Sequence, residues 1–460
     1  MQQTSKTSRR QFLGRLAAIG LAPTIVPATA LGRGGRLAPS ERIGVGMIGL
    51  GRQCIARNLP VFMKRGDCEV VALCDVDRQR LTVRDVPFVQ ASAKRHKWDP
   101  DRLRSCFRTT DFRELLNRKD VDAVMISTPD HWHPTIAVAA IQAGKDVCCE
   151  KPLGLAIAHG RAIADAAAKA KCVFRTDSEF RSIPHLYKAV ALVRTGRIGE
   201  LKRIRIAVPV YWGALPMQPE MPVPEWLEYD MWLGPAPKAP YTEKRVHTNK
   251  LHDRPGWFSN RDYCDGMISN WGYHPCDVAQ WANDTELTGP VEIEGRGDFP
   301  PKHYLWNTIL DFDVHYRYAN GVEMFYIGRQ QYKTHPDYAG SQAFMRFEGT
   351  EGWVCGWYGP DRLDAEPKTL LDVKITPEEF PFPLKNEKHD FLDCVRSRSR
   401  TLEDAEVGHR SSTVAQLGYI ACQVGRRLRW DPEKERFPDD EEAQALLNRP
   451  CREPWQIPVG

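Results

Sequence analysis

Apolar runs alternate with amphipathic stretches through the first third of the chain. From Ile43 onward, the segments IGVGMIGLG, EVVALCDVD, VDAVMISTPD and KDVCCEKP each hold a short apolar run of the length of a buried strand. Helical stretches such as HPTIAVAAIQAG and HGRAIADAAAKA lie between and after them. Buried strands that alternate with helices predict an α/β domain built on a doubly wound parallel sheet.

The pattern changes after about residue 200. The segments LKRIRIAVPVYW, YLWNTILDFDVHYRYANGVEMFYIG and SQAFMRFEGTEGWVCGWYG alternate apolar and polar positions with a period of two, and Asn320-Gly321 lies where a hairpin turn is expected. We predict a second α/β domain with a large open mixed or antiparallel sheet, packed on one face. Its aromatic residues favour a face-to-face homo-oligomer, a dimer or a tetramer: Trp306, Tyr316, Tyr318, Phe325 and Tyr326.

These changes of pattern divide the chain of 460 residues into four parts. They are a leader (1–30), a parallel-sheet domain (31–165), a substrate and oligomerisation domain with C-terminal helices (166–437), and a C-terminal tail (438–460). The length suits two or three domains with sizeable cores.

The leader has the order of an export signal. SRRQFLG places twin arginines before the apolar run LAAIGLAPTIVPA, and Ala28-Thr29-Ala30 resembles a cleavage site. This array predicts a Tat-type signal, hence the Tat export machinery as a partner and a periplasmic or otherwise extracytoplasmic protein. The alternative is a basic N-terminus without a targeting role. No other run approaches the roughly 20 apolar residues that span a bilayer.

Charge and cysteine content exclude several classes of protein. The formal charge is +5, but four of the positive charges lie in the leader, so the rest of the chain carries only +1. That balance does not favour a nucleic-acid partner. The thirteen cysteines form no C-x-x-C pair, and their odd number favours neither a disulfide framework nor a zinc site.

A glycine turn follows the first predicted strand. Gly49 and Gly51 permit a tight turn and a close approach to a pyrophosphate at a helix N-terminus, as in a Rossmann domain. Asp75 ends the next strand, 24 residues after Gly51, where a carboxylate binds a ribose diol and repels a 2′-phosphate. NAD is therefore expected rather than NADP, although Arg78 would soften that choice. The alternative is a structural turn with an exposed acid. The turn contributes Gly49, Leu50, Gly51, Arg52 and Gln53.

Two further segments, STPDHWHP and CCEKP, follow predicted strands at the edge of the sheet where ligands bind. We assign to the cofactor site Ser127, Thr128, Pro129, His131, His133, Glu150 and Lys151. The two histidines lack a third ligand at a recognisable spacing, so no metal is expected. Lys151 beside a nicotinamide could also hydrogen-bond a substrate hydroxyl and help move its proton. A solvent-exposed lysine in a turn is the alternative.

The stretch SNWGYHPCD brings Asn270 and His274 together if it is helical, because residues four apart share a face. A reaction site is one interpretation of this pair. The other is a helix start with an N-cap residue and a packed histidine.

Together the segments resemble one family in their order along the chain. IGLGRQC, CDVD, STPDHWH, CEKP, WLGPAP, SNWGYHPCDVAQW, FEGTEGW and FLDCVRSRS resemble the Gfo/Idh/MocA oxidoreductases over residues 42 to 437. The resemblance implies a Rossmann domain followed by an α/β domain whose open sheet carries substrate contacts and often the oligomer interface. It also implies hydride transfer between a nicotinamide and a secondary alcohol carbon.

By this resemblance Lys151 and His274 handle the proton, and Asn270 stands where the family has an aspartate. An amide contributes no charge, so Asn270 is expected to orient rather than to form an ion pair. Asp177 and Glu179 in TDSEFRS also replace neutral residues of the family. The expected substrate contacts are Arg181, Tyr273 and Asp277.

The sequence therefore predicts an exported NAD-dependent oxidoreductase that acts on a secondary hydroxyl of a sugar or sugar derivative. Because Tat carries folded proteins, its cofactor should be loaded before export, held tightly and recycled internally. One alternative is a glycosidase or epimerase that uses transient oxidation. An alternative of another class is a non-catalytic sugar-binding protein on the same fold.

Overall fold

The computed structural model describes residues 37–38, 41–82, 86–210, 213–247, 256–328, 343–359 and 361–457. The chain divides into two compact units, Met1–Arg42 and Ile43–Gly460, and the fold lies within the second. The twin arginines and the candidate cleavage site lie outside the described residues, so export stays a prediction.

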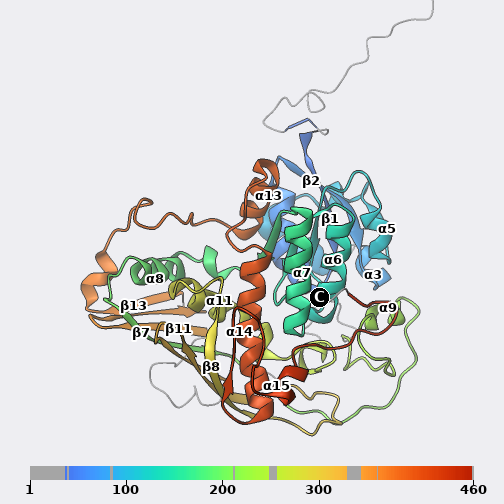
Figure 1. Ribbon diagram of the computed structural model, residues 1–460. Helices are drawn as coiled ribbons and strands as arrows, with labels where there is room; N and C mark the ends of the chain where they lie inside the picture. The colour runs from blue at the N-terminus through green and yellow to red at the C-terminus, as the bar shows by residue number, and fades with distance from the viewer. Residues whose placement is uncertain are drawn as a thin grey trace, which may run out of the picture. The chain divides into compact units, whose positions relative to one another are not determined.

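A parallel sheet forms the first half of the second unit (Figure 1). In the described part of the chain it has six strands in the order β3-β2-β1-β4-β5-β6, with every pair parallel. The strands are β1 (Ile43–Ile48), β2 (Cys68–Cys74), β3 (Phe107–Thr109), β4 (Ala123–Ile126), β5 (Asp146–Glu150) and β6 (Phe174–Asp177). This is the Rossmann order that the alternation of strands and helices predicts. With β6 the sheet extends beyond residue 165.

Helices cover both faces of this sheet. One face packs against a π-helical turn η3 (Cys54–Asn58), α2 (Leu59–Lys64), α4 (Pro87–His96) and α13 (Glu387–Ser397). The other packs against α5 (Phe112–Leu116), α6 (His133–Gln142) and α7 (Ile157–Ala170). Short elements join them: α3 (Arg78–Leu81), η5 (Pro100–Leu103) and η6 (Asp130–Trp132). Because α13 comes from the distant C-terminal part, the Rossmann core is completed by residues outside the first half of the chain.

A large mixed sheet forms the second half. Among the described residues its order is β13-β12-β11-β7-β10-β9-β8-β14, with β7 and β10 parallel. The strands are β7 (Leu201–Val208), β8 (Pro290–Asp298), β9 (Asp311–Tyr318), β10 (Glu323–Gly328), β11 (Ala343–Gly349), β12 (Trp353–Tyr358), β13 (Arg362–Glu366) and β14 (Leu428–Arg429). The predicted hairpin at Asn320-Gly321 joins β9 to β10, and Gly321 has a φ of +85°. The predicted fold class is confirmed.

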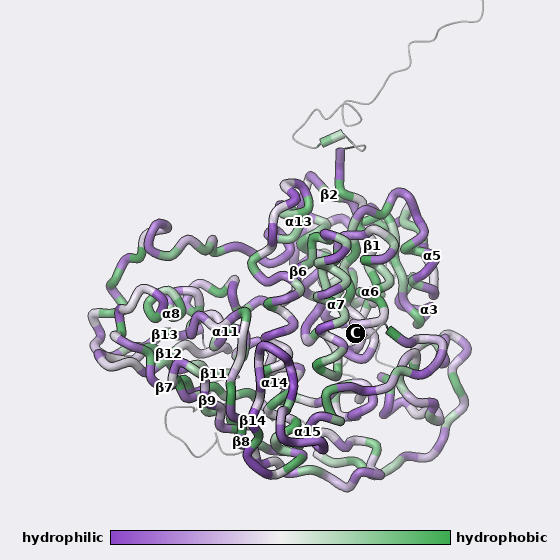
Figure 2. The backbone as a smooth tube through the Cα atoms, viewed as in Figure 1, coloured by the Kyte–Doolittle hydropathy of each residue, from purple (hydrophilic) through white to green (hydrophobic). Residues whose placement is uncertain are grey.

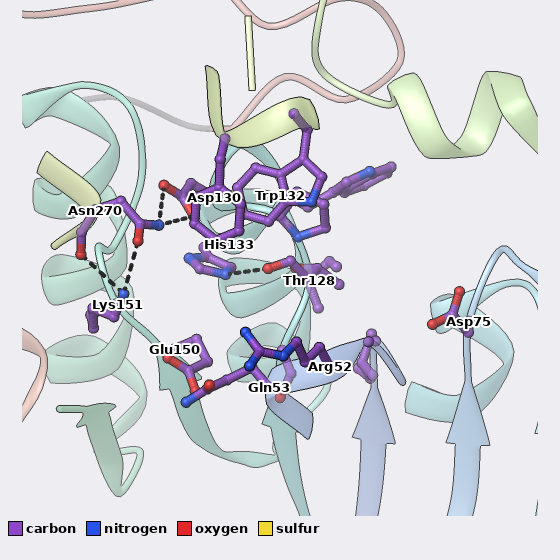
Figure 3. Close-up of a pocket in the computed structure, with 18 of the residues that line it drawn as sticks. Arg52, Gln53, Asp75, Thr128, Asp130, Trp132, His133, Glu150, Lys151 and Asn270 are labelled. Atoms are coloured by element: carbon purple, nitrogen blue, oxygen red, sulfur yellow. Dashed lines mark hydrogen bonds between the residues drawn. The ribbon is translucent and has the colours of Figure 1, made fainter. Parts of the chain in front are cut away.

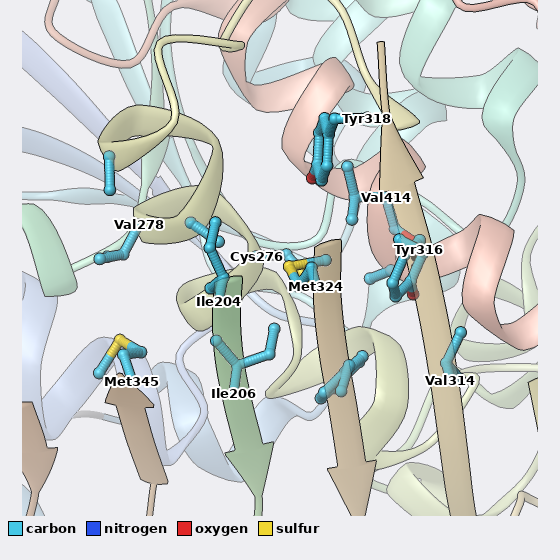
Figure 4. Packing of buried hydrophobic residues seen from close by; sticks show 14 of the residues in the cluster. Ile204, Ile206, Cys276, Val278, Val314, Tyr316, Tyr318, Met324, Met345 and Val414 are labelled. Carbon is cyan, nitrogen blue, oxygen red and sulfur yellow. Dashed lines mark hydrogen bonds between the residues drawn. The ribbon is translucent and has the colours of Figure 1, made fainter. Parts of the chain in front are cut away.

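Helices cover one face of the mixed sheet, namely α8 (Pro184–Arg194), α11 (Tyr273–Ala282) and the long α14 (Ala405–Val424). Figure 4 shows side chains of β7, β9 and β10 packing against α11 and α14. Figure 2 shows hydrophilic and hydrophobic residues mixed along α14 and the short α15 (Glu441–Ala445), and most residues of α14, polar ones included, are buried. The remaining elements lie in connections: η7 (Phe180–Ser182), α9 (Tyr229–Leu233), η8 (Gly256–Ser259), α10 (Met267–Asn270) and η10 (Lys368–Asp372).

The packed face holds most of the aromatic residues that we expected at an oligomer interface. Tyr316, Tyr318 and Tyr326 are buried under the helices, so they cannot form a surface for another subunit. Phe325 lies on the opposite face and is partly exposed, whereas Trp306 lies in a connection after β8. The period-two pattern correctly predicted the strands, but it does not indicate which face of the sheet the helices cover.

Two further observations concern the whole described chain. No helix among the described residues is long and apolar enough to cross a membrane. All thirteen cysteines lie in described segments as free thiols, and eleven of them are buried. Burial in apolar surroundings raises the pKa of most of these thiols, so they act as small core residues.

Candidate active site

A cavity of about 460 Å³ opens at the carboxyl ends of β1, β2, β4 and β5 and continues toward α10, α11 and β12. Figure 3 shows Asp75 at one end, Lys151 and Asn270 at the other, and Arg52, Gln53 and Glu150 between them. The Rossmann strand ends therefore form one wall, and residues of the second half of the chain close the opposite end.

The glycine turn forms the floor of the cavity. Gly49 has a φ of +85°, and a Cβ there would lie 2.6 Å from the carbonyl oxygen of Ser127. At Gly51 an added Cβ would meet only the end of a flexible side chain, Arg80 Nη1 at 3.4 Å. Gly49 is thus required by the backbone, and Gly51 leaves room for a ligand. Gly49, Gly51, Arg52 and Gln53 line the cavity as predicted.

Asp75 lies at the end of the cavity where the sequence predicts the adenosine ribose, and its carboxylate accepts two hydrogen bonds from the backbone. Its Oδ2 accepts a hydrogen bond of 2.7 Å from the backbone N–H of Leu50, and its Oδ1 accepts one of 2.9 Å from Asp77. Leu50 itself is fully buried and contributes only through this backbone contact. Burial raises the pKa of Asp75, and Arg80 at 3.7 Å opposes that shift. Arg80, not Arg78, is therefore the arginine next to this carboxylate.

Arg78 points elsewhere, since its guanidinium pairs with Glu228 and donates to the carbonyl oxygen of Glu225. Arg78 does not line the cavity, and its influence on the choice between NAD and NADP stays a prediction.

The side chain of His133 connects the turns after β4 and β5. His133 Nδ1 lies 2.7 Å from the carbonyl oxygen of Pro152, and Nε2 lies 2.9 Å from that of Thr128. Ser127, Thr128, Pro129, His133 and Glu150 all line the cavity. Glu150 is held by Asn58, which donates at 3.0 Å. The cofactor contacts assigned to these residues stay a prediction.

His131 is placed differently from the prediction. Its ring is buried among Trp132, Trp232 and Tyr263, with Nε2 3.2 Å from the carbonyl oxygen of Trp232. Burial lowers the pKa of His131 to about 3, so the ring is neutral at ordinary pH. It packs away from the cofactor cavity because it precedes α6 on the side that faces α9.

Lys151 and Asn270 are in direct contact at the closed end of the cavity. Lys151 Nζ donates to the backbone oxygen of Asn270 at 3.0 Å and to its side-chain Oδ1 at 3.2 Å. Asn270 Nδ2 in turn lies 2.9 Å from each carboxylate oxygen of Asp130 (Figure 3). The amide therefore orients Lys151, whereas we expected it to orient His274.

His274 lies in the first turn of α11 and also lines the cavity. Its Nδ1 shares a hydrogen bond of 2.7 Å with Ser178 Oγ, and its ring stacks on Phe180 with centroids 4.6 Å apart. Burial, Lys151 and Lys388 lower the pKa of His274 well below its usual value. The imidazole is thus neutral, with Nε2 left for a ligand. Pro275 causes no break, because it sits in the first turn, where the helix needs no N–H donor.

The three predicted substrate contacts, Arg181, Tyr273 and Asp277, do not line the cavity. Arg181 forms a bidentate ion pair with Asp277, both distances being 2.7 Å, and a third contact of 2.7 Å with Glu286. Tyr273 is fully buried and donates to Glu403 at 2.7 Å. Burial and the nearby Asp277 raise the pKa of Glu403 to about 8. These residues form a polar network behind the site.

Sequence reasoning missed several residues of the cavity wall. Asp130, the residue after Pro129 in STPDHWHP, is 2% exposed and lines the cavity. Its place in the turn that follows β4 was a usable signal. Glu179 accepts a bond of 3.3 Å from the Tyr358 hydroxyl, and burial raises the pKa of this carboxyl group. An aromatic and apolar part of the wall comes from Met231, Trp232, Trp257, Phe258, Trp271 and Tyr358.

The residues of the cavity fit a dinucleotide. Gly51 leaves a space that a Cβ would enter, Arg52, Arg57 and Arg80 supply positive charge, and Asp75 keeps acceptor capacity at the ribose position. The buried Thr128 hydroxyl lacks a hydrogen-bond partner in the described structure, as expected for a group that meets a ligand. Among the described residues no group of three His, Cys, Asp or Glu side chains is arranged to hold a metal ion.

Comparisons with family profiles agree with this geometry. Residues 43–178 match the NAD-binding Rossmann fold of the Gfo/Idh/MocA oxidoreductase family, and residues 205–457 match its C-terminal α/β domain. The second match alone covers more than half of the chain.

Curated relatives match over shorter stretches. Levoglucosan dehydrogenase of Pseudarthrobacter phenanthrenivorans is 33% identical over 111 residues, which is 24% of this chain and 28% of the relative. A glycosyl hydrolase family 109 protein of Stenotrophomonas maltophilia is 36% identical over 149 residues, 32% of this chain and 30% of the relative. The chain thus matches less than a third of the length of either relative.

Solved structures share the fold over most of the chain. A levoglucosan dehydrogenase in complex with NADH and levoglucosan has a TM-score of 0.58 at 17% identity, covering 87% of this chain and all of the other. The aldose-aldose oxidoreductase of Caulobacter crescentus also has a TM-score of 0.58, at 18% identity, covering 84% and 99%. The Rossmann cavity and both profile matches establish that the chain belongs to the Gfo/Idh/MocA oxidoreductase family, with an NAD-binding N-terminal domain.

Proposed function

We propose that this protein is an NAD-dependent oxidoreductase that acts on a secondary hydroxyl of a sugar or sugar derivative. The observation that carries the proposal is the convergence of Lys151 and His274 on one cavity with a glycine turn at its other end. Aromatic side chains such as Trp257 and Trp271 line the cavity. Flat aromatic faces suit the apolar faces of sugar rings.

The two polar groups have different tasks. Bound NAD supplies the hydride acceptor for alcohol oxidation. Two of the three N–H donors of the Lys151 ammonium are taken by Asn270, so the third is left to hydrogen-bond the substrate oxygen as negative charge develops there. The neutral imidazole of His274 can accept the hydroxyl proton at Nε2, because Nδ1 is already bonded to Ser178.

A direct test measures nicotinamide absorbance of the purified protein in both directions: aldoses and levoglucosan are added to the protein with NAD, and the ketone 1,5-anhydro-D-fructose is added to the protein with NADH. These probes are taken from the names of related proteins. The Lys151→Ala variant should lose sugar-dependent reduction of NAD by at least about a hundredfold and still bind NAD. Lys202→Ala, at a surface lysine paired with Glu200, is the matched control and should behave as the wild type.

Two results would oppose the proposal. A protein that does not bind NAD is not an NAD-dependent oxidoreductase. A protein that binds NAD, and is stabilised against heat by sugars without any redox change, is instead a sugar-binding protein on the same fold.

A second candidate is a glycosidase or epimerase cycle with transient oxidation. It is favoured by Glu179, a carboxyl group of the cavity wall whose pKa is raised by burial and by neighbouring carboxylates. A carboxylic acid that stays protonated can protonate a leaving group. Some relatives are named as glycosyl hydrolase family 109 proteins, and one from Shewanella oneidensis as α-N-acetylgalactosaminidase.

An activated α-N-acetylgalactosaminide distinguishes the two cycles. Transient oxidation predicts release of the leaving group without accumulation of NADH, and Glu179→Gln should reduce that release while cofactor reduction persists. Simple dehydrogenation predicts NADH in equal amount to oxidised sugar and no release. A Glu179→Gln variant that releases the leaving group at the wild-type rate would remove the support for this candidate.

We also propose export with the cofactor already bound. The support is the twin-arginine leader, and an exported enzyme needs internal recycling because no cytoplasmic NAD pool is at hand. Fractionation of cells that produce the full chain tests this, with an Arg9→Lys, Arg10→Lys variant as control. Equal amounts of both proteins in the cytoplasm would contradict export.

A homo-oligomer through the uncovered face of the mixed sheet is the last part of the proposal. On that face Arg203 and Arg205 lie over the Phe325 ring at 5.6 and 5.4 Å, and Arg346 lies over Trp353 at 4.0 Å. Light scattering should report a dimer or tetramer, and Phe325→Asp should shift it toward the monomer. A wild-type monomer at micromolar concentration would refute this part.

A further inference from the structure

At position 270, where the family has an aspartate, this chain has the amide Asn270. The carboxylate of Asp130 is hydrogen-bonded to that amide. Asp130 begins η6 after β4, and Asn270 ends α10, 140 residues later. The fold brings the two side chains into contact, and Asn270 stands between Asp130 and Lys151 (Figure 3).

We propose that Asp130 is the positioning carboxylate of this site: acting through the Asn270 amide, it orients the Lys151 ammonium toward the substrate oxygen. Asp130 would thus supply, from a different segment, the negative charge that the amide at position 270 lacks. The inference rests on the proposed function of Lys151 and adds a residue that neither the motif nor the resemblance assigns.

The amide can have only one orientation between these two partners. Asn270 Nδ2 is a donor and lies 2.9 Å from both oxygens of Asp130, whereas Oδ1 is an acceptor and lies 3.2 Å from Lys151 Nζ. If the Asn270 amide were flipped, its N–H groups would face the Lys151 ammonium and its oxygen would face the Asp130 carboxylate, so both pairs would repel each other. The carboxylate therefore fixes the amide, and the amide with its own backbone oxygen fixes two of the three ammonium donors.

Asp130 is buried, so it is not one of the surface carboxylates that interact mainly with water. A carboxylate that is 2% exposed is stable only when it is well bonded, because removal of a charge from water is unfavourable. Burial raises the pKa of Asp130, and the groups that oppose this are His133, Lys151, Asn270 and Cys264. These groups favour the ionised form and oppose the effect of burial. Asn270 Nδ2 lies within hydrogen-bond distance of both carboxylate oxygens, as expected when both act as acceptors.

Several ionisable groups lie around Lys151. Asp130 faces it through Asn270, and Glu150, Glu179, His133 and His274 line the same cavity. Among the described acids around Lys151, Asp130 is connected to it by hydrogen bonds through the side chain of Asn270. Removing its charge alone should therefore favour the neutral amine at a lower pH.

The experiment uses three variants of the full chain: Asp130→Asn, Asn270→Asp and the exchange of both. Asp130→Asn keeps the shape and can still accept a hydrogen bond from Asn270, but it carries no charge. The exchange puts a carboxylate directly beside Lys151. Asp146→Asn, at a buried carboxylate of β5 that pairs with Arg398 outside the cavity, is the matched control.

The first measurement does not need activity. Acylation of Lys151 at a series of pH values, read by mass spectrometry of its peptide, should reach its midpoint about one pH unit lower in Asp130→Asn than in the wild type. The exchange should return the midpoint to the wild-type value or above, and Asp146→Asn should leave it unchanged. An unchanged midpoint in Asp130→Asn, with NAD binding intact, refutes the inference.

The second measurement is the pH profile of kcat with the best sugar of the panel. In Asp130→Asn the loss of rate on the alkaline side should begin about one pH unit lower, and kcat should fall at least tenfold with little change in the affinity for NAD. The exchange should recover most of that loss. A merely structural role would lower the melting temperature without moving the profile, and would not be rescued by the exchange.

Failure of the inference and failure of the proposed function are separate outcomes. If the wild type transfers no hydride with any sugar, the proposed function fails. The pH midpoint of Lys151 acylation then still tests whether the charge of Asp130 acts on Lys151. If the wild type is active and Asp130→Asn matches it in both measurements, only the inference is wrong.

Discussion

Replacement of Arg181 by methionine should destabilise the protein strongly and leave its affinity for substrate unchanged. The guanidinium is buried and makes contacts of 2.7 Å with Asp277 and Glu286, one of 3.1 Å with the carbonyl oxygen of Leu402, and a cation–π contact with Trp281 at 4.9 Å. Methionine retains much of the apolar stem but removes the charge. Asp277, which is 0% exposed, would then keep only the Ser411 hydroxyl as a side-chain donor among the described residues.

The magnitude follows from the cost of an unpaired buried charge. Removal of one partner of a buried ion pair costs about 3–5 kcal/mol, and Arg181 serves two carboxylates. By contrast, Arg104 pairs with Asp101 at 3.1 Å where both side chains are more than half exposed. Arg104→Met should therefore change the free energy of unfolding by no more than about 1 kcal/mol.

Urea unfolding followed by tryptophan fluorescence measures these differences, and initial rates on folded protein give KM. A second variant, Arg181→Met with Asp277→Leu, should recover part of the lost stability because it removes the unpaired charge as well. The opposite pattern would refute the reasoning: a wild-type free energy of unfolding together with a raised KM would make Arg181 a substrate contact, as the sequence predicts.

The remaining predictions concern the cofactor turn and the buried histidines. Gly49→Ala should destabilise the Rossmann domain, because its Cβ would lie 2.6 Å from a backbone oxygen at a φ of +85°, whereas Gly51→Ala should fold normally and bind NAD at least tenfold more weakly in a fluorescence titration. Asp75→Asn should weaken NAD binding and narrow the preference for NAD over NADP, since the carboxylate that repels a 2′-phosphate is removed; unchanged relative affinities would contradict this. His131 has a pKa of about 3 in the folded protein against 6.5 when unfolded, so the unfolded chain takes up the proton first as the pH falls. Its contribution to stability is complete above pH 6.5 and is lost below it, by about 2 kcal/mol at pH 5; His131→Gln should abolish that share of the acid destabilisation, and identical pH dependence in both proteins would refute the assignment.

Local patterns in the sequence predicted much of the Rossmann half. The apolar runs of β1, β2, β4 and β5, the glycine turn and Asp75 at the end of β2 depend on neighbours within a few residues, and all lie where expected. The carboxyl ends of parallel strands meet at one edge, so Ser127 and Lys151 reach the same cavity for a reason that the strand order already contains.

The errors arose where a side chain had two possible surroundings. Arg181 and Asp277 have the residue types of a substrate site, but they lie on elements 96 residues apart that pack into the interior, so they pair with each other. His131 and His133 differ by two positions, yet one meets the aromatic cluster below α9 and the other the cavity. Tyr316 and Tyr326 follow the period of a strand, which fixes that they share a face but not whether helices cover that face.

The sequence by itself determined the order of strands and helices, the nucleotide turn and the identity of Lys151, because these depend on local backbone preferences and on short spacings. Only the tertiary structure decided which polar residues face the cavity, and it alone brought Asp130 to Asn270 across 140 residues. The physical reason is burial: whether a charge binds a ligand or a neighbouring side chain depends on what the folded chain packs around it, and that surrounding is assembled from segments far apart in the sequence.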